Sequence, residues 1–253
     1  MLFPICHWSS NKGGFLAVTT LAPDVASSLD GVNWTIHPNV LHQNGEYIAK
    51  GDNIFCALSA FSETLETSLT GLLWTITASV PLSCYQPAWN GVVFCANQGL
   101  GNTVTSPDGI TWTQHVGAIN KASFGIAALD GLFCIVSQVG YTTNSTATST
   151  DGVTWAYHTD VLPSVTFMYI AATDKVFCTL NSFTGQTALS SDGVSWTEYP
   201  GIGAPNFYQL AWNGKILCAI NIYTGDTATS SDGITWNIHL ASLPIGYYGI
   251  CGQ

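Results

Sequence analysis

The stretch Thr105-Ser106-Pro107-Asp108-Gly109-Ile110-Thr111-Trp112 decides the fold, because the chain repeats it. Five related stretches also end in tryptophan, and the one at residues 67–74 has lost its aspartate. A fixed period of about 40 residues is typical of repeat architectures, in which each repeat is one supersecondary unit. The tryptophans that close the six copies are Trp34, Trp74, Trp112, Trp155, Trp196 and Trp236.

Each part of the repeated motif has a physical role. Asp-Gly between two β-rich runs predicts a tight hairpin turn, because glycine adopts positive φ without steric cost. The preceding Ser or Thr and the aspartate can hydrogen-bond the local backbone. The tryptophan follows in an alternating pattern and is large enough to fill a wedge between neighbouring sheets. Since one active site does not need six copies, we assign the motif to the scaffold: Asp30, Trp34, Trp74, Asp108, Trp112, Asp151, Trp155, Asp192, Trp196, Asp232 and Trp236.

The last complete repeat predicts four short strands, at residues 207–212, 215–220, 227–230 and 234–239. Asn213-Gly214 predicts a hairpin turn between the first two strands. Four antiparallel strands in about 40 residues make one propeller blade. No segment shows a sustained period of 3.6 residues, so we expect essentially no helix. The sequence therefore predicts an all-β, six-bladed β-propeller of four-stranded antiparallel blades, forming a single domain over residues 1–253.

The two ends of the chain compete for one position in this ring. Residues 3–7 and residues 247–251 both resemble a first strand, and the first blade needs only one. The spare strand either pairs at the seam and closes the ring or adds to a neighbouring chain, which would give an oligomer. The sequence leaves both alternatives open.

Charge and composition exclude several classes of partner. The chain has five lysines, no arginine and 15 acidic residues, for a formal charge of −10. A nucleic-acid or anionic membrane surface would be repelled. No apolar run reaches the length of about 18 residues that a spanning helix needs, so we expect no membrane insertion. The start has no basic segment followed by an apolar core, which predicts synthesis in the cytoplasm without a signal peptide.

The eight cysteines do not predict a disulfide framework. Five of them, Cys56, Cys95, Cys134, Cys178 and Cys218, recur at the same place in different repeats, too far apart to bridge. We therefore expect reduced thiols that act as small buried hydrophobic residues. Because the chain has no Cys-x-x-Cys pair, we expect no metal site and no cofactor.

The histidines and glutamates give weak candidates for catalysis. Four histidines each follow a motif tryptophan by three residues, so they belong to separate repeats and cannot converge on one ion: His37, His115, His158 and His239. Glu63 and Glu66 are expected to share one loop, where two carboxylates could serve a glycosidase. We favour a solvated loop over a catalytic pair.

The motif Ser-x-Asp-Gly-x-Thr-Trp resembles the Asp-box of sialidase-type propellers, with one residue fewer between Asp and Gly. This compact form also resembles repeats in β-propellers of phage virion and bacterial surface proteins. The resemblance implies a propeller and leads us to expect a non-enzymatic structural or attachment protein of a virion, on a phage tail or capsid surface. The sialidase mechanism is excluded, because it needs an arginine triad and lysine is not an equivalent partner for a carboxylate.

Propeller topology places the connections between blades and the loops between second and third strands on one face. The candidate binding residues on this face are Phe61, Tyr141, Phe183, Tyr223, Tyr85, Tyr208 and Tyr247. Aromatic rings beside Asn, Gln and Thr suit stacking on sugars or contact with a protein, although the same rings could instead plug the central channel. The partners we expect are other virion proteins, or a glycan or protein of the host surface. A lectin-like carbohydrate-binding module, or less plausibly a glycan hydrolase or lyase, is the alternative.

Overall fold

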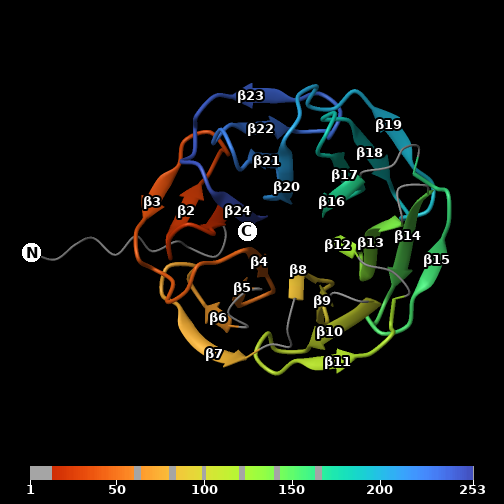
Figure 1. Ribbon diagram of the computed structural model, residues 1–253, viewed down its shortest axis with the longest axis horizontal. Helices are drawn as coiled ribbons and strands as arrows, with labels where there is room; N and C mark the ends of the chain where they lie inside the picture. The colour runs from red at the N-terminus through yellow and green to blue at the C-terminus, as the bar shows by residue number, and fades with distance from the viewer. Residues whose placement is uncertain are drawn as a thin grey trace, which may run out of the picture.

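A computed structural model describes residues 13–59, 64–79, 84–98, 101–119, 123–139, 143–162 and 167–252. These residues form six four-stranded antiparallel sheets and no helix. The sheets stand radially around one axis, with β4, β8, β12, β16, β20 and β24 innermost (Figure 1). The predicted six-bladed β-propeller is therefore confirmed. Within the same residues, no helix is long and apolar enough to cross a membrane.

The first three blades follow the order of the chain except at the seam. Blade 1 contains β24 (Tyr247–Gly252), β1 (Phe15–Thr19), β2 (Val25–Ser28) and β3 (Thr35–His37). Blade 2 contains β4 (Tyr47–Lys50), β5 (Phe55–Ser59), β6 (Thr64–Ser68) and β7 (Thr75–Ser79). Blade 3 contains β8 (Cys84–Trp89), β9 (Phe94–Gln98), β10 (Asn102–Ser106) and β11 (Thr113–His115).

Each of the other three blades is built from four strands that are consecutive in the chain. Blade 4 contains β12 (Ser123–Leu129), β13 (Leu132–Val139), β14 (Thr143–Ser149) and β15 (Ala156–His158). Blade 5 contains β16 (Phe167–Ala172), β17 (Phe177–Asn181), β18 (Thr187–Ser190) and β19 (Thr197–Tyr199). Blade 6 contains β20 (Phe207–Trp212), β21 (Leu217–Asn221), β22 (Thr227–Ser230) and β23 (Asn237–His239).

The C-terminal strand closes the ring. β24 pairs antiparallel with β1, with Gly252 opposite Phe15 and Gly249 opposite Val18, and so supplies the innermost strand of blade 1. Of the two segments that the sequence offered for this position, residues 247–251 occupy it. Residues 3–7 lie outside the described residues, so the role of a spare strand is not decided.

The Asp-Gly motif forms a longer loop than the tight hairpin turn that the sequence predicted. In blade 6 the third strand ends at Ser230 and the fourth begins at Asn237, three residues later than expected. The Asp232 carboxylate is the cause, because it accepts hydrogen bonds from the backbone N–H groups of Ile234 and Thr235, both at 2.8 Å. The loop therefore wraps around the aspartate, and Trp236 precedes the strand instead of lying in it.

The motif tryptophan packs between two blades, as the wedge prediction required. Trp112 of blade 3 lies against the cluster that contains Cys56 and Leu58 of blade 2, and its ring centroid is 6.1 Å from that of Phe94. Its Nε1–H donates a hydrogen bond to the Gly109 carbonyl at 3.3 Å, which fixes the ring over its own loop. The other five motif tryptophans each belong to an equivalent interblade cluster: Trp34, Trp74, Trp155, Trp196 and Trp236.

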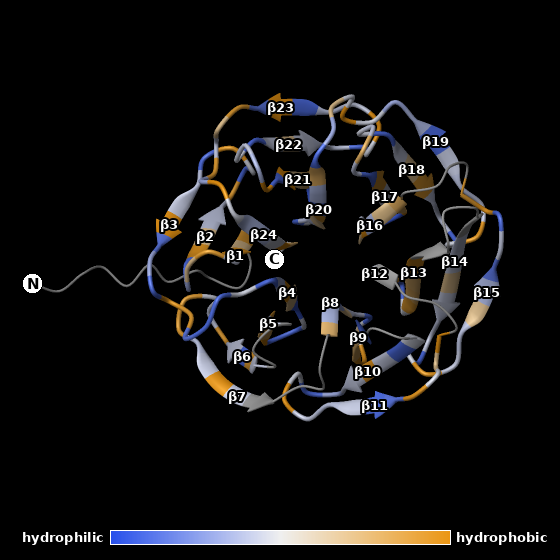
Figure 2. Cartoon of the chain, in the orientation of Figure 1, coloured by the Kyte–Doolittle hydropathy of each residue, from blue (hydrophilic) through white to orange (hydrophobic). Residues whose placement is uncertain are grey.

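The second strand of each blade is buried and the fourth faces solvent. Figure 2 shows apolar residues on β13, β17 and β21 and more polar ones on β11 and β23. The four repeat histidines lie at the ends of the fourth strands, where each Nε2 lies within 2.9 Å of a Ser or Thr hydroxyl of the same blade. The prediction that they belong to separate blades is confirmed.

Candidate functional site

Bulges in the innermost strands re-aim aromatic side chains at one end of the ring. In β20 the pairing skips from Phe207 to Gln209, which leaves Tyr208 as the extra residue. The same irregularity falls beside Tyr85 in β8 and Tyr248 in β24. A bulge breaks the inside–outside alternation of a strand and redirects a side chain. As a result these three tyrosines are half-buried, while most of the neighbouring residues in their strands are buried.

Six tyrosines from five blades form a connected group, here called the tyrosine mouth: Tyr47, Tyr85, Tyr169, Tyr208, Tyr223 and Tyr248. Four edge-to-face contacts link them, with the centroid separations Tyr85–Tyr47 6.0 Å, Tyr47–Tyr248 5.6 Å, Tyr169–Tyr208 5.5 Å and Tyr208–Tyr223 5.8 Å. The hydroxyls of Tyr169 in blade 5 and Tyr248 in blade 1 lie 3.2 Å apart. Because blade 6 stands between those two blades, this contact runs across the inside of the ring.

Three phenols of the mouth, those of Tyr47, Tyr169 and Tyr208, have a raised pKa and stay in their neutral form. Burial, reinforced by the Tyr248 phenol, raises the pKa of both Tyr47 and Tyr169 far above the ordinary value. Burial and a hydrogen bond with Tyr223 raise the pKa of Tyr208 to about 12. A neutral phenol can both donate and accept hydrogen bonds, so the mouth offers polar contacts together with aromatic rings.

Two glutamines lie one residue further along the same innermost strands. Gln86 donates from Nε2 to the Ile170 carbonyl in β16, at 3.5 Å. This bond joins blade 3 to blade 5 and so passes blade 4, which stands between them. The Gln86 Oε1 and Gln209 Nε2 atoms are buried and have no hydrogen-bond partner within the part of the chain that the structure describes. A buried polar atom without a partner is costly, so these two atoms mark places for a water molecule or a ligand group.

A buried carboxylate lies beside the tyrosines. Glu46 immediately precedes β4 and is only 7% exposed. Its backbone N–H donates a hydrogen bond to the Leu58 carbonyl at 3.0 Å. Its charge adds to burial and to the phenols of Tyr248 and Tyr169 in raising the pKa of Tyr47. The mouth therefore combines aromatic rings, neutral hydroxyls and one buried acid.

Phe183 and Tyr223 stand out from the same face in matching loops. They are 65% and 63% exposed, and they lie between the second and third strands of blades 5 and 6. In blade 6 the Asn221 Oδ1 atom accepts hydrogen bonds from the backbone of Tyr223 and Thr224, at 3.1 and 3.3 Å. Asn181 holds Phe183 in the same way. The two exposed rings are thus carried on loops with fixed geometry.

The other predicted binding residues are distributed differently. Tyr85 and Tyr208 belong to the tyrosine mouth, as described above. Tyr247 is 4% exposed and packs in the core with Phe15 and Leu243, so it does not line the mouth. Phe61 and Tyr141 lie outside the described residues.

The expectation that Glu63 and Glu66 share a solvated loop is wrong for Glu66. Glu66 lies in β6 and is only 3% exposed. Its carboxylate accepts hydrogen bonds from the backbone of His42 and Gln43, and the Nδ1 atom of His42 lies 3.0 Å away. These contacts brace the connection from blade 1 to blade 2. Glu63 lies outside the described residues, and among those that are described no three His, Cys, Asp or Glu side chains form a group that could hold a metal ion.

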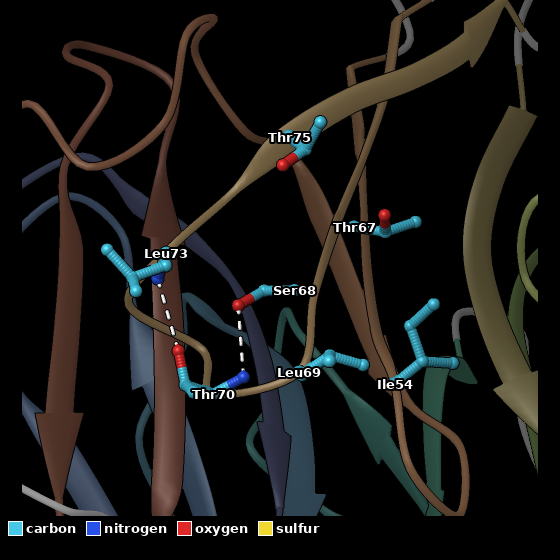
Figure 3. Close-up of a pocket in the computed structure, with 7 residues that line it drawn as sticks. All are labelled: Ile54, Thr67, Ser68, Leu69, Thr70, Leu73 and Thr75. Carbon is cyan, nitrogen blue, oxygen red and sulfur yellow. Dashed lines mark hydrogen bonds between the residues drawn. The ribbon is translucent and has the colours of Figure 1, made fainter.

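Beside the worn repeat of blade 2 lies a hollow of about 290 Å³ on the side of the motif loops, lined by one isoleucine, two leucines and four Ser or Thr residues. Leu69 and Leu73 lie at its edge and are exposed, and Thr70 takes the place of the motif aspartate (Figure 3). The Thr70 hydroxyl accepts hydrogen bonds from the Leu72 and Leu73 N–H groups, at 3.3 and 3.2 Å, which preserves the two backbone bonds that the motif aspartate accepts elsewhere. The loop is therefore kept while its surface becomes apolar.

Several residues of the site were not predicted as such: Tyr47, Tyr169, Glu46, Gln86 and Gln209. One signal for part of this set is visible in the sequence. The first strands of blades 3 and 6 share the pattern Tyr-Gln-x-Ala-Trp, at residues 85–89 and 208–212. Aligning the first strands of all the blades would have brought these positions together.

Comparison with known proteins supports the fold. No family model and no curated protein matches the chain. Solved structures do match. A structure described as a nidogen/laminin complex superposes with a TM-score of 0.73 at 12% identity, covering 95% of this chain and 98% of that one. Streptogramin B lyase gives a TM-score of 0.58 at 12% identity, covering 91% and 74%. YCF48 bound to D1 peptide gives 0.54 at 16% identity, covering 90% and 85%. Because the sequence identities are this low, the similarity to these structures shows the fold alone, which is that of a β-propeller.

Proposed function

We propose that this propeller is a non-catalytic binding protein, and that it docks a protein partner on the face that carries the tyrosine mouth, Phe183 and Tyr223. The observation that carries the proposal is the connected group of six tyrosines, of which Tyr223 is exposed on a fixed loop, beside the exposed ring of Phe183 on the matching loop. Tyrosine supplies a large contact area with few rotatable bonds and is enriched in the cores of protein interfaces. Loops on a rigid scaffold are also where binding residues concentrate.

Two of the similar structures have protein or peptide partners in their descriptions. One is a nidogen/laminin complex, and another is YCF48 bound to D1 peptide. Propellers of this shape are therefore compatible with partner binding. The partner of this chain is a separate question, and the proposal that it is a virion component or a host-surface molecule is supported by the motif resemblance alone.

A glycan is the second candidate ligand, because of the two buried glutamines. Gln86 presents an acceptor and Gln209 a donor without partners. Sugar hydroxyls can satisfy both, and tyrosine rings can stack on the sugar. A glycan hydrolase or lyase has less support, since the Glu66 carboxylate is taken up by the backbone of residues 42 and 43.

The proposal can be tested by partner capture from an extract of the native source, followed by mass spectrometry. The wild-type protein would be compared with the double variant Tyr208→Ala/Tyr223→Ala and with Val92→Ser, a change on the opposite face at an exposed position. We expect a partner that is retained by Val92→Ser and lost by the double variant, with equal melting temperatures. If the double variant retains every partner, the proposed face is wrong.

A further inference from the structure

We propose that the tyrosine mouth receives a cationic side chain of the partner, and that arginine is the residue that it fits. This inference rests on the proposed binding function and specifies the chemistry of the partner. Three features point to it: the aromatic rings beside the buried acid Glu46, the unpartnered acceptor atom of Gln86, and the distribution of charge over the molecule.

The first feature is the combination of rings and negative charge. Tyrosine rings attract a cation through their negative faces, and the attraction grows when water is excluded. Glu46 is buried next to Tyr47 and contributes a full negative charge when ionised. The rings and the Glu46 carboxylate would each favour a positively charged ligand group over a neutral group of the same shape.

The second feature is the direction of the Gln86 amide. The Gln86 Nε2 atom donates to the Ile170 carbonyl. A flipped amide would instead place the Gln86 Oε1 atom against the Ile170 carbonyl oxygen, and two acceptors would then face each other. Oε1 therefore remains an acceptor, more than nine-tenths buried and without a partner among the described residues. Since Gln86 reaches across the ring, this acceptor lies inside it. An acceptor in this position calls for an N–H or O–H donor, and a guanidinium group supplies five N–H donors.

The third feature is the distribution of charge over the molecule. The described lysines Lys50, Lys175 and Lys215 lie at the turns between first and second strands, on the face opposite to the mouth. That opposite face also carries acids, among them Asp52, Asp130 and Asp174 at turns of the same kind. The acids Asp24 and Asp226 lie in loops between second and third strands, on the same face as the mouth, where no described lysine lies. With a formal charge of −10, the whole chain attracts a basic partner.

The absence of arginine from the sequence makes this prediction more specific. A second copy of the chain cannot provide a guanidinium group, so the occupant must come from another molecule. Guanidinium is also planar and weakly hydrated, and it stacks on aromatic rings more readily than the ammonium group of lysine does.

The test is a titration with N-acetylarginine methylamide and, as a neutral isostere, N-acetylcitrulline methylamide. Binding would be followed by NMR of the protein labelled with ¹³C in the tyrosine rings. We expect the arginine compound to bind in the millimolar range and at least about fivefold more tightly than the citrulline compound, a ratio equivalent to about 1 kcal/mol. The chemical-shift changes should include the ring signal of Tyr208, which is identified by its loss in the Tyr208→Phe variant. Equal affinities for the two compounds, or shifts confined to Tyr157 on the outer strand β15, would overturn the inference.

Two variants separate the roles of charge and of ring. Glu46→Gln keeps the size of the side chain and should lower the preference for arginine toward unity. Because Glu46 is buried, its folding must be checked, and Tyr208→Leu at a half-buried position provides an independent loss of affinity. Asp130→Asn removes an acid on the opposite face and should leave the preference unchanged. If the double variant Tyr208→Ala/Tyr223→Ala abolishes partner capture but no arginine preference exists, the inference fails while the proposed function stands.

Discussion

Gly109 lies directly against Cys56 of the preceding blade. The Gly109 carbonyl accepts a hydrogen bond from the Cys56 thiol at 3.5 Å, and a Cβ atom added to Gly109 would lie 2.6 Å from the Cys56 sulphur. The equivalent pairs are Gly31 with Cys218, Gly152 with Cys95, Gly193 with Cys134 and Gly233 with Cys178. In the worn repeat, Gly71 meets Leu16, which takes the place of the cysteine. The repeated cysteine and the repeated glycine are thus two halves of one interblade contact.

Replacing this glycine should destabilise the fold more than replacing a glycine in open space. Gly109 has φ +74° and Gly117 has φ +68°, but nothing lies within 4 Å of a Cβ atom at Gly117. We expect Gly109→Ala to lower the free energy of unfolding by about 2 to 4 kcal/mol and Gly117→Ala by about 1 to 2 kcal/mol. Urea denaturation measures both. Adding Cys56→Ala to Gly109→Ala should recover part of the loss, and no recovery would show that the sulphur contact is not the cause.

The motif tryptophan should contribute more than the motif aspartate. Trp112 packs with Phe94 and with residues of blade 2. Truncation of a large aromatic residue in a core typically costs about 3 to 5 kcal/mol, so we expect a loss of that size for Trp112→Ala. Asp108→Ala removes hydrogen bonds at an exposed loop and should cost about 1 kcal/mol. An unchanged melting temperature for Trp112→Ala would refute its role between the blades.

Acid should weaken the motif loops. Hydrogen bonds from the backbone N–H groups of the loops hold the pKa of Asp108, Asp192 and Asp232 below the ordinary value. For Asp30, hydrogen bonds outweigh the opposing effect of burial and lower the pKa to about 2. A carboxyl group with a depressed pKa stabilises the fold above its unfolded pKa, near 4, and loses that contribution as the pH falls through the folded value. The fall in the urea midpoint between pH 5 and pH 2 should be smaller for Asp108→Asn than for the wild type, and identical profiles would contradict this account.

The cysteines should be unreactive in the folded protein. The seven cysteines within the described residues are buried and free. Burial, assisted by the charge of a nearby Asp108, raises the pKa of Cys56 to about 12, and burial raises that of Cys178 to about 12. Since only the thiolate reacts readily, we expect negligible labelling by Ellman's reagent at pH 8 in buffer. In guanidinium chloride without reductant, most of the eight thiols should react, and two or fewer would indicate disulfides.

The fold could be predicted from the sequence because six copies of a turn and a tryptophan fix both the blade and the number of blades. The shape of the motif loop could not be predicted, since the hydrogen bonds that the Asp232 carboxylate accepts from Ile234 and Thr235 extend the turn beyond Asp-Gly. The sequence placed Phe183 and Tyr223 correctly in loops between second and third strands. Their role in binding remains a prediction.

The inner part of the site was harder to predict for a physical reason. A bulge adds a residue that the simple alternation of a strand does not show, so the direction of Tyr208 or Tyr248 depends on the pairing of the strand. Glu66 occupies the register position that Val104 occupies in blade 3, where a buried residue is expected. Its hydrogen-bond donors lie more than 20 residues away, at His42 and Gln43, and the packing of the connection between blades 1 and 2 against β6 brings them together.

Photo-crosslinking can locate the face of the propeller that contacts the partner, which we propose is the face with the tyrosine mouth. p-Benzoylphenylalanine would be placed at Tyr223 on that face and, in a second protein, at Val92 on the opposite face, since both positions are exposed. We expect one discrete crosslinked partner from position 223, absent when Tyr208→Ala is added, and no equivalent product from position 92. A product from position 92 with none from position 223 would contradict this proposal.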